Sequence, residues 1–277
     1  MSVAEVCVPP AVLALIDRAR IGLTAACLTL AVAGASTAGE VRCWIDDGAV
    51  VVPAAYGPIA GDFILDLSQA RSQLHATAAQ TAGWTSDTAR WPLRFAGETR
   101  RDFPMTVADL DSRIADFPTN IAGVLGADAF GRFTLDLDLR PCRLLLSRGL
   151  PQRLPGLHRL QTAVIADAPA VSAAISDGLT TRTGWFAIDT ASASSRIADA
   201  GFSRPLPTGV DASGRTRGPA RLRAMSVGGA LFEQTPAGLM RPVTPGLAGA
   251  LGTAVWARFH LRIEGRRVGA WRVQVGP

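Results

Sequence analysis

Two aspartates follow apolar stretches in a way that could bring a pair of carboxyl groups into one site. Asp189 ends an apolar run in GWFAIDTASASSRI (184–197), and Asp66 ends a similar run in DFILDLSQARSQL (62–74). Uncharged residues follow both aspartates: Leu67 and Ser68 after the first, and Thr190, Ala191 and Ser192 after the second. Two carboxyl groups a few Å apart can share one proton. The ionised carboxylate can then act as a general base on water, while the protonated one donates to a carbonyl oxygen.

The two aspartates belong to an internal repeat. Asp66 lies 60 residues before Gly126, and Asp189 lies 63 residues before Gly252. Each glycine closes an apolar element: Val124-Leu125-Gly126 and Ala250-Leu251-Gly252. Two segments then align without a gap: GADAFGRFTLDL (126–137) and GTAVWARFHLRI (252–263). The repeat predicts two halves of the same structure and makes the two aspartates a matched pair.

Short strands punctuated by Gly and Pro dominate both halves, so we expect a mainly β protein. Two apolar runs separated by a turn precede each aspartate, and Asp177-Gly178 is a strong hairpin signal. Helical periodicity is confined to residues 70–81 and 127–133. We divide the chain into an N-terminal segment (1–38), a first lobe (39–147), a linker (148–159) and a second lobe (160–277).

The N-terminal segment has the residue order of an export signal. Arg18 and Arg20 precede the uncharged run 21–35, and small residues lead to a suitable cleavage point after Ala38. We therefore expect a periplasmic or secreted protein. Two alternatives stay open: an uncleaved anchor, which would be the protein's one attachment to a membrane, and a buried core helix.

Composition narrows the classes of partner. The net charge is +5, and the 28 basic residues, all of them arginine, are scattered without interleaved aromatics. A nucleic-acid-binding face needs a denser basic stripe, so we expect no nucleic-acid partner. The three histidines stand apart, and the sequence contains no HExxH, CxxC or Gly-x-Ser-x-Gly pattern, so we expect no metal and no cofactor.

Two of the four cysteines, Cys43 and Cys142, stay in the chain if residues 1–38 are removed. They lie near the start and the end of the first lobe. In an oxidising compartment they could form a disulfide, and two buried free thiols are the alternative.

The halves resemble the two lobes of bacterial aspartic proteases of the pepsin/retropepsin type. The most specific segment is IAGVLGADAFGRFTLDLDLRPCRLLL (121–146), and the resemblance extends over nearly the whole chain after residue 38. It implies a two-lobed pepsin-like fold built from two homologous β-barrel-like lobes. It also implies a cleft for a peptide or unfolded protein between the lobes, one catalytic aspartate from each lobe, and a monomer. Asp66 and Asp189 match those two positions.

The turns depart from the Asp-Thr-Gly pattern of that family. Thr190 matches the hydroxyl residue that braces the opposite lobe, but Leu67 cannot make that bond. Ser68 and Ala191 replace the glycine, where a Cβ would crowd a turn that needs a glycine-only conformation. Ser192 matches the small residue that often follows. The family's flap, a hairpin over the cleft, is expected between each aspartate and its glycine, and Tyr56 precedes that interval.

Two functions therefore compete. The retained aspartates favour an aspartic-type peptidase, in which Thr190 braces the site and the neighbouring residues complete the turns. The altered turns favour a non-catalytic homologue that binds peptides or proteins in the cleft. A structural envelope protein that uses the fold as an interaction surface is a third possibility.

Overall fold

The computed structural model describes residues 39–148, 154–198, 209–210, 216–217, 220–240, 244–266 and 270–277. These residues belong to one compact unit. The predicted export segment, residues 1–38, lies outside the described residues, and so do residues 149–153 of the predicted linker.

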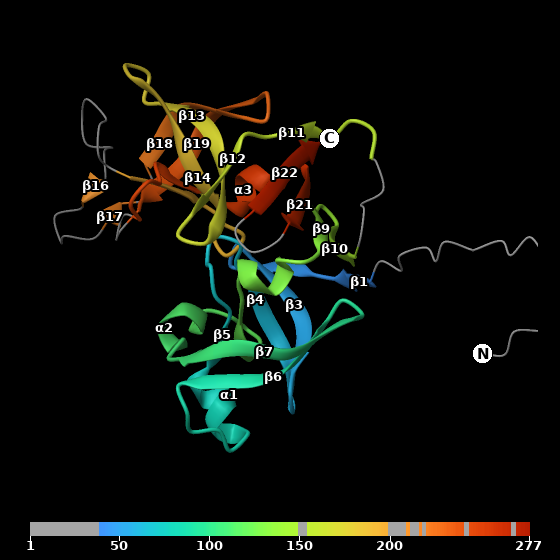
Figure 1. Ribbon diagram of the computed structural model, residues 1–277. Coiled ribbons are helices and arrows are strands. Elements are labelled where there is room, and N and C mark those ends of the chain that lie inside the picture. The colour runs from blue at the N-terminus through green and yellow to red at the C-terminus, as the bar shows by residue number, and fades with distance from the viewer. Residues whose placement is uncertain are drawn as a thin grey trace, which may run out of the picture. The chain divides into compact units, whose positions relative to one another are not determined.

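A closed barrel of six strands forms the first half of the molecule (Figure 1). Around the ring the strands are β3 (Ala49–Tyr56), β4 (Ile59–Leu65), β8 (Ile121–Leu125), β5 (Gln73–His75), β7 (Glu98–Ala108) and β6 (Thr88–Phe95). Pairing of β3 with β6 closes the ring, and β2 (Trp44–Asp46) lies beside β3. Successive residues of β3 point to opposite faces, so Val50 and Val52 enter the main core while Val51 packs with Ile64 in a second cluster.

A second six-stranded barrel repeats this order in the second half. Its ring contains β13 (Ala168–Ser176), β14 (Thr181–Ile188), β20 (Gly249–Leu251), β15 (Ser195–Ile197), β19 (Ala230–Leu239) and β18 (Ala220–Val227). Pairing of β13 with β18 closes it, and β12 (Thr162–Ile165) lies beside β13. The predicted turn at Asp177-Gly178 joins β13 to β14, and Gly178 has the positive φ of 97° that suits glycine. The two barrels confirm the predicted mainly β, two-lobed architecture.

A third sheet is shared by both halves, and the sequence did not predict it. Its order is β1 (Gly39–Arg42), β10 (Cys142–Ser147), β9 (Thr134–Leu139), β21 (His260–Arg266), β22 (Ala270–Gly276) and β11 (His158–Arg159). The central contact pairs β9 of the first half with β21 of the second, and Leu137 lies opposite Leu261. Both leucines are buried, so the junction between the halves is part of the main core. Residues 158–159, which we assigned to the linker, are a strand of this sheet.

The helices are short. They are α1 (Ala76–Thr81), α2 (Asp111–Ile114), α3 (Thr253–Trp256) and the 3-10 helix η1 (Ala127–Phe130), and a separate pair of strands is β16 (Gly209–Val210) with β17 (Thr216–Arg217). The helical prediction for 70–81 was wrong in its first half, because residues 73–75 pair as β5 with β7 and β8. In the part of the chain that the structure describes, no helix is long and apolar enough to span a membrane.

A hairpin lies between Asp66 and Gly126, in the interval where the resemblance leads us to expect a flap. Strands β6 and β7 form it, and its turn at Ala96-Gly97 packs against β1 of the shared sheet. The packing is close, because an added Cβ on Gly39 would lie 1.5 Å from the backbone oxygen of Ala96. Tyr56 is fully buried and donates its hydroxyl to the backbone oxygen of Phe103 at 2.9 Å.

Candidate active site

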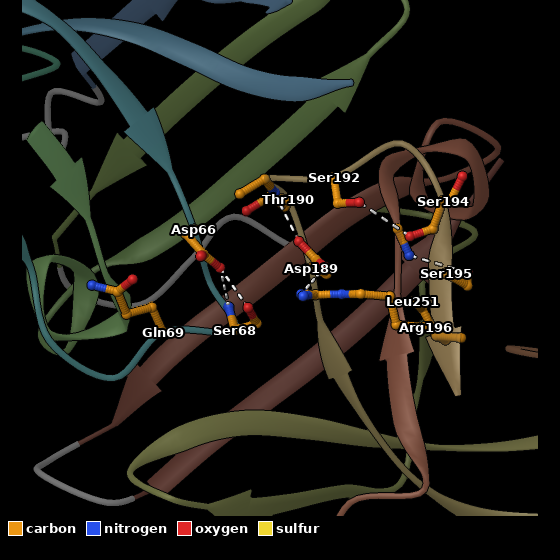
Figure 2. Close-up of polar contacts among 12 residues, drawn as sticks. Asp66, Ser68, Gln69, Asp189, Thr190, Ser192, Ser194, Ser195, Arg196 and Leu251 are labelled. Atoms are coloured by element: carbon orange, nitrogen blue, oxygen red, sulfur yellow. Dashed lines mark hydrogen bonds and ion pairs between the residues drawn. The ribbon is translucent and has the colours of Figure 1, made fainter. Parts of the chain in front are cut away.

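The two barrels place Asp66 and Asp189 at equivalent strand ends. Asp66 directly follows β4, Asp189 directly follows β14, and each of these strands runs parallel to the strand that ends in Leu125 or Leu251. The backbone N–H of Asp66 donates to the oxygen of Leu125, and that of Asp189 to the oxygen of Leu251, both at 2.9 Å. The two aspartates face each other from the two halves in Figure 2. Two strand ends with the same hydrogen bonds therefore bring the predicted pair together.

The glycines of the repeat fix the turns that follow the aspartates. The N–H of Gly126 donates to Ser72 Oγ at 2.9 Å, and that of Gly252 donates to Ser195 Oγ at 3.2 Å. Each serine lies six residues after its aspartate. Our sequence analysis missed these serines, although their equal spacing in the repeat could have found them.

The residues that replace the family's turn glycines keep the backbone support of the carboxylates. The N–H of Ser68 donates to Asp66 Oδ1 at 2.9 Å, and the N–H of Ala191 donates to Asp189 Oδ1 at 3.0 Å. Neither Ser68 nor Ala191 has a positive φ, so neither turn needs a glycine-only conformation. Ser68 also donates its hydroxyl to Asp66 Oδ1 at 2.6 Å. The substitutions therefore leave both turns intact.

Thr190 links the two turns across the halves. Its hydroxyl donates to the backbone oxygen of Leu65 at 2.7 Å and accepts the N–H of Leu67 at 3.1 Å. Both Thr190 and Leu67 are fully buried, and the Leu67 side chain packs in the main core. The brace is therefore made from the second half to the first, while an apolar side chain takes the place of the reciprocal hydroxyl.

Each carboxylate also forms an ion pair with an arginine that the sequence analysis did not single out. Arg113 Nη2 donates to Asp66 Oδ2 at 2.5 Å, and Arg196 Nη2 donates to Asp189 Oδ2 at 2.6 Å. Arg113 also donates through Nη1 to Gln69 Oε1 at 2.8 Å.

The predicted turn residue Ser192 does not hydrogen-bond to either aspartate in the described structure. Its hydroxyl donates to the backbone oxygen of Ser194 at 3.2 Å (Figure 2).

The surroundings of Asp189 favour its protonated form. Burial raises the pKa of the Asp189 carboxyl, and the nearby negative charge of Asp66 raises it further. The ion pair with Arg196 and the N–H of Ala191 act in the opposite direction, but the net pKa lies above its usual range. A buried carboxyl beside a second carboxyl is the electrostatic arrangement that allows one proton to be shared.

In the described residues no group of three or more His, Cys, Asp or Glu side chains could hold a metal ion. The polar groups around the two carboxyls are the guanidinium groups of Arg113 and Arg196 and the hydroxyls of Ser68 and Thr190.

Comparison with known proteins identifies the architecture. The sequence matches no protein-family profile and no curated protein. Among solved structures, the chain is similar to the aspartic proteinase from Irpex lacteus, with a TM-score of 0.51 and 12% sequence identity. The alignment covers 87% of this chain and 97% of that proteinase. The fold is pepsin-like. At this low identity the likeness extends to the pepsin-like fold alone, in which the two closed barrels correspond to the two lobes.

Proposed function

We propose that this protein is an aspartic-type peptidase that hydrolyses peptide bonds with Asp66 and Asp189. The observation that carries this proposal is the pairing of two buried carboxyls from equivalent turns of the two lobes. The raised pKa of Asp189 next to Asp66 supports a dyad that holds one proton. A peptide or unfolded protein that lies between the lobes would present its carbonyl group to this pair.

The reaction needs no group beyond the dyad and one water molecule. The ionised Asp66 accepts a proton from water as the water oxygen bonds to the carbonyl carbon, and Asp189 gives its proton to the carbonyl oxygen. The resulting tetrahedral diol collapses when its C–N bond breaks and the amine nitrogen takes up the proton held by Asp66. One hydroxyl proton returns to Asp189 as the acid product forms, so the dyad recovers its starting state.

The test uses the chain from Gly39 onward and a mixed peptide library from pH 3 to 8, with new peptide ends identified by mass spectrometry. We expect cleavage in acid, and we expect Asp66→Asn and Asp189→Asn each to abolish it. Asp116→Asn, which changes an exposed aspartate on the same lobe, should cleave like the wild type. A folded wild-type protein that cuts no peptide at any pH would rule out this function.

A second candidate is a non-hydrolytic protein that binds peptides between the lobes. Two observations favour it: both carboxylates are ion-paired to arginine, and Leu67 lacks the reciprocal hydroxyl. Arginine beside a carboxyl favours the ionised form and so opposes the proton that hydrolysis requires. Peptides retained by the folded protein without cleavage, in the same library, would select this function.

We also propose that the protein is exported and monomeric. The order of residues 18–38 supports export, as does the disulfide between Cys43 and Cys142, a bond typical of oxidising compartments. N-terminal sequencing of the protein recovered outside the cytoplasm should find Gly39 first, whereas an intact N-terminus in the membrane fraction would indicate an anchor. Sedimentation would establish the number of chains.

A further inference from the structure

The Oδ1 atoms of Asp66 and Asp189 have equivalent hydrogen-bond donors, whereas their Oδ2 atoms have donors from different parts of the repeat. Each Oδ1 accepts the N–H of the third residue in its own turn, which is a property of the repeat. Each Oδ2 accepts a hydrogen bond from an arginine side chain. The two arginines occupy positions that are not equivalent in the two halves of the repeat. Arg113 lies in α2, 47 residues after its aspartate, and Arg196 lies in β15, seven residues after its own. Each lobe therefore has an aspartate–arginine ion pair, but the arginine comes from a different element in each lobe.

A chain of contacts in the first lobe holds Arg113 against Asp66. Helix α2 is anchored to β5 by His75, whose Nδ1 accepts the N–H of Leu110 at 3.4 Å and whose Nε2 lies 3.2 Å from Asp111 Oδ1. The side-chain oxygen of Gln69 then accepts a hydrogen bond from Nη1 of the Arg113 guanidinium. Residues 68 and 69 depart from the family pattern, and both contact this ion pair, since Ser68 donates to Asp66 and Gln69 accepts from Arg113. The altered turn is therefore adapted to an arginine.

The second lobe holds its aspartate with fewer groups. Among the described residues, Asp189 is the one hydrogen-bonding partner of the Arg196 guanidinium, and the buried Arg196 Nε has no partner. The Arg196 side chain is 44% exposed, whereas that of Asp189 is 1% exposed. The hydrogen bonding of the Arg196 side chain in the described structure is thus with Asp189 alone.

The charges explain what these contacts would do to the dyad. A guanidinium within hydrogen-bonding distance stabilises the ionised carboxylate and lowers the pH at which a proton binds. Burial and the repulsion between the two carboxylates act in the opposite direction. Within the described residues, Arg113 and Arg196 are the cations in contact with the dyad, and the pair of His75 with Asp111 lies at the start of the helix that carries Arg113.

We propose that Arg113 and Arg196 are positioning residues of the dyad, which hold one carboxyl each and set the pH below which the pair takes up its proton. This inference rests on the proposed peptidase function. Loss of either arginine lets the dyad keep its proton to higher pH, because the ionised form loses its partner. The upper limit of the active pH range then moves upward.

The test compares Arg113→Gln and Arg196→Gln with the wild type in pH profiles of peptide cleavage. We expect the alkaline limb to move up by about one to two pH units in each variant, the size of the effect of an adjacent opposite charge. Arg113→Lys and Arg196→Lys keep the charge and should restore most of the wild-type limb. Arg90→Gln removes an exposed arginine of the first lobe that pairs with Asp102. The alkaline limb of the pH profile of this variant should stay unchanged. An active protein whose limb does not move in either glutamine variant would overturn the inference and leave the proposed function intact.

A second measurement keeps the inference testable if no variant cleaves peptides. Carboxyl carbons labelled in aspartate report protonation directly by NMR, and the signals of Asp66 and Asp189 are assigned with the two Asp→Asn variants. An upward shift of the aspartate titration in Arg113→Gln and Arg196→Gln, without cleavage, would support the inference while the proposed function fails. Titration curves that coincide with the wild type would overturn it.

Discussion

At the scale of single residues, the two glycines of the repeat pack closely against the turns that follow the aspartates. A Cβ added to Gly126 would lie 2.7 Å from the backbone carbon of Arg71, and one added to Gly252 would lie 2.6 Å from the backbone oxygen of Ala193. Both contacts are with the backbone of the turn that follows the aspartate. Because backbone cannot move aside like the end of a long side chain, the turn itself must shift.

We therefore predict that Gly126→Ala and Gly252→Ala each destabilise the protein by about 1–3 kcal/mol, the usual range for overpacking. A shift of about 1 Å in the dyad should also slow hydrolysis by about 10²-fold. Urea unfolding and cleavage rates measure the two effects. Gly238→Ala is the control, since no described atom would lie within 4 Å of its added Cβ. If Gly126→Ala and Gly252→Ala lose no more stability than Gly238→Ala, the turns tolerate a Cβ.

Among the described residues, Thr190 is the one whose hydroxyl group forms hydrogen bonds between the two turns that carry the aspartates. Thr190→Val keeps the shape of the side chain but leaves the Leu65 carbonyl and the Leu67 N–H without their partner. We expect a loss of about 1–3 kcal/mol, the cost of buried polar groups left unsatisfied. Thr190→Ser restores the hydroxyl and should recover most of that loss in urea unfolding. A valine variant as stable as the wild type would show that the bridge contributes nothing to stability.

The sequence predicted the members of the site that obey the repeat. Asp66, Asp189 and the two glycines recur at matched positions, and the structure brings the two aspartates together. Arg113 and Arg196 could not be found in this way, because each lobe places its arginine on a different element. Long-range side-chain contacts leave no period in a single sequence.

At the scale of secondary structure, turn chemistry was the most reliable signal. The predicted turns between β3 and β4 and between β13 and β14 contain Gly57 and Gly178, both with positive φ. The helical prediction for 70–81 was wrong in its first half because an alternation of small and polar residues also suits a short strand. Pairing of Leu74 with Val107 and Gly123 then decides for β5, an effect of tertiary structure on local preference.

The element that joins the halves contains a partly buried set of charges. His260 of β21 contacts Asp136 Oδ1 at 2.9 Å and Asp138 Oδ1 at 2.8 Å, both on β9, and Arg262 donates to Asp136 at 2.6 Å. The hydrogen bond with Asp136 raises the pKa of His260 above its usual range, against the effect of burial. Because the folded protein raises this pKa, protonated His260 stabilises the fold fully below about pH 6.5, the unfolded value. That stabilisation is lost as the pH rises through the higher folded pKa.

We predict that His260→Gln lowers the urea midpoint at pH 5.5 and has a much smaller effect at pH 9. The reason is that the imidazole loses its charge as the pH rises through its folded pKa, and with it most of its attraction to Asp136 and Asp138. His158→Gln changes an exposed histidine of the same sheet and provides the control at both pH values. An equal loss at pH 5.5 and pH 9 would mean that packing, not charge, explains the contribution of His260.

At the scale of the whole molecule, the shared sheet is the feature that a single sequence reveals least. Its pairs join residues far apart in the chain, such as Leu135 with Ile263, although the strands that meet at its centre lie in the two aligned segments of the repeat. The repeat predicted two similar lobes because similarity is visible in sequence. The way in which the lobes share a sheet depends on pairing partners, which the alternation of apolar residues does not specify.

The disulfide acts where the first barrel and the shared sheet meet. Cys43 lies between β1 of the shared sheet and β2 beside the barrel, and its N–H donates to the backbone oxygen of Cys142 at the start of β10. The bond joins residues separated by 99 positions, so it encloses nearly the whole first lobe. A crosslink across a loop of this length restricts the unfolded chain strongly, and the chain-entropy description gives about 4–5 kcal/mol.

We therefore predict that replacing both cysteines by serine lowers the free energy of unfolding by about 2–5 kcal/mol. The effect should come from the crosslink, because Cys43 and Cys142 lie at the edge of the core and a serine fits in their place with little loss of packing. Urea unfolding of the wild type in reductant is the control, and it should match the double variant. If the oxidised wild type and the double variant unfold at the same midpoint, the two thiols do not pair in solution. In that outcome, β1 is held in the shared sheet by its pairing with β10 and its packing against the β6–β7 turn, and the disulfide no longer supports export.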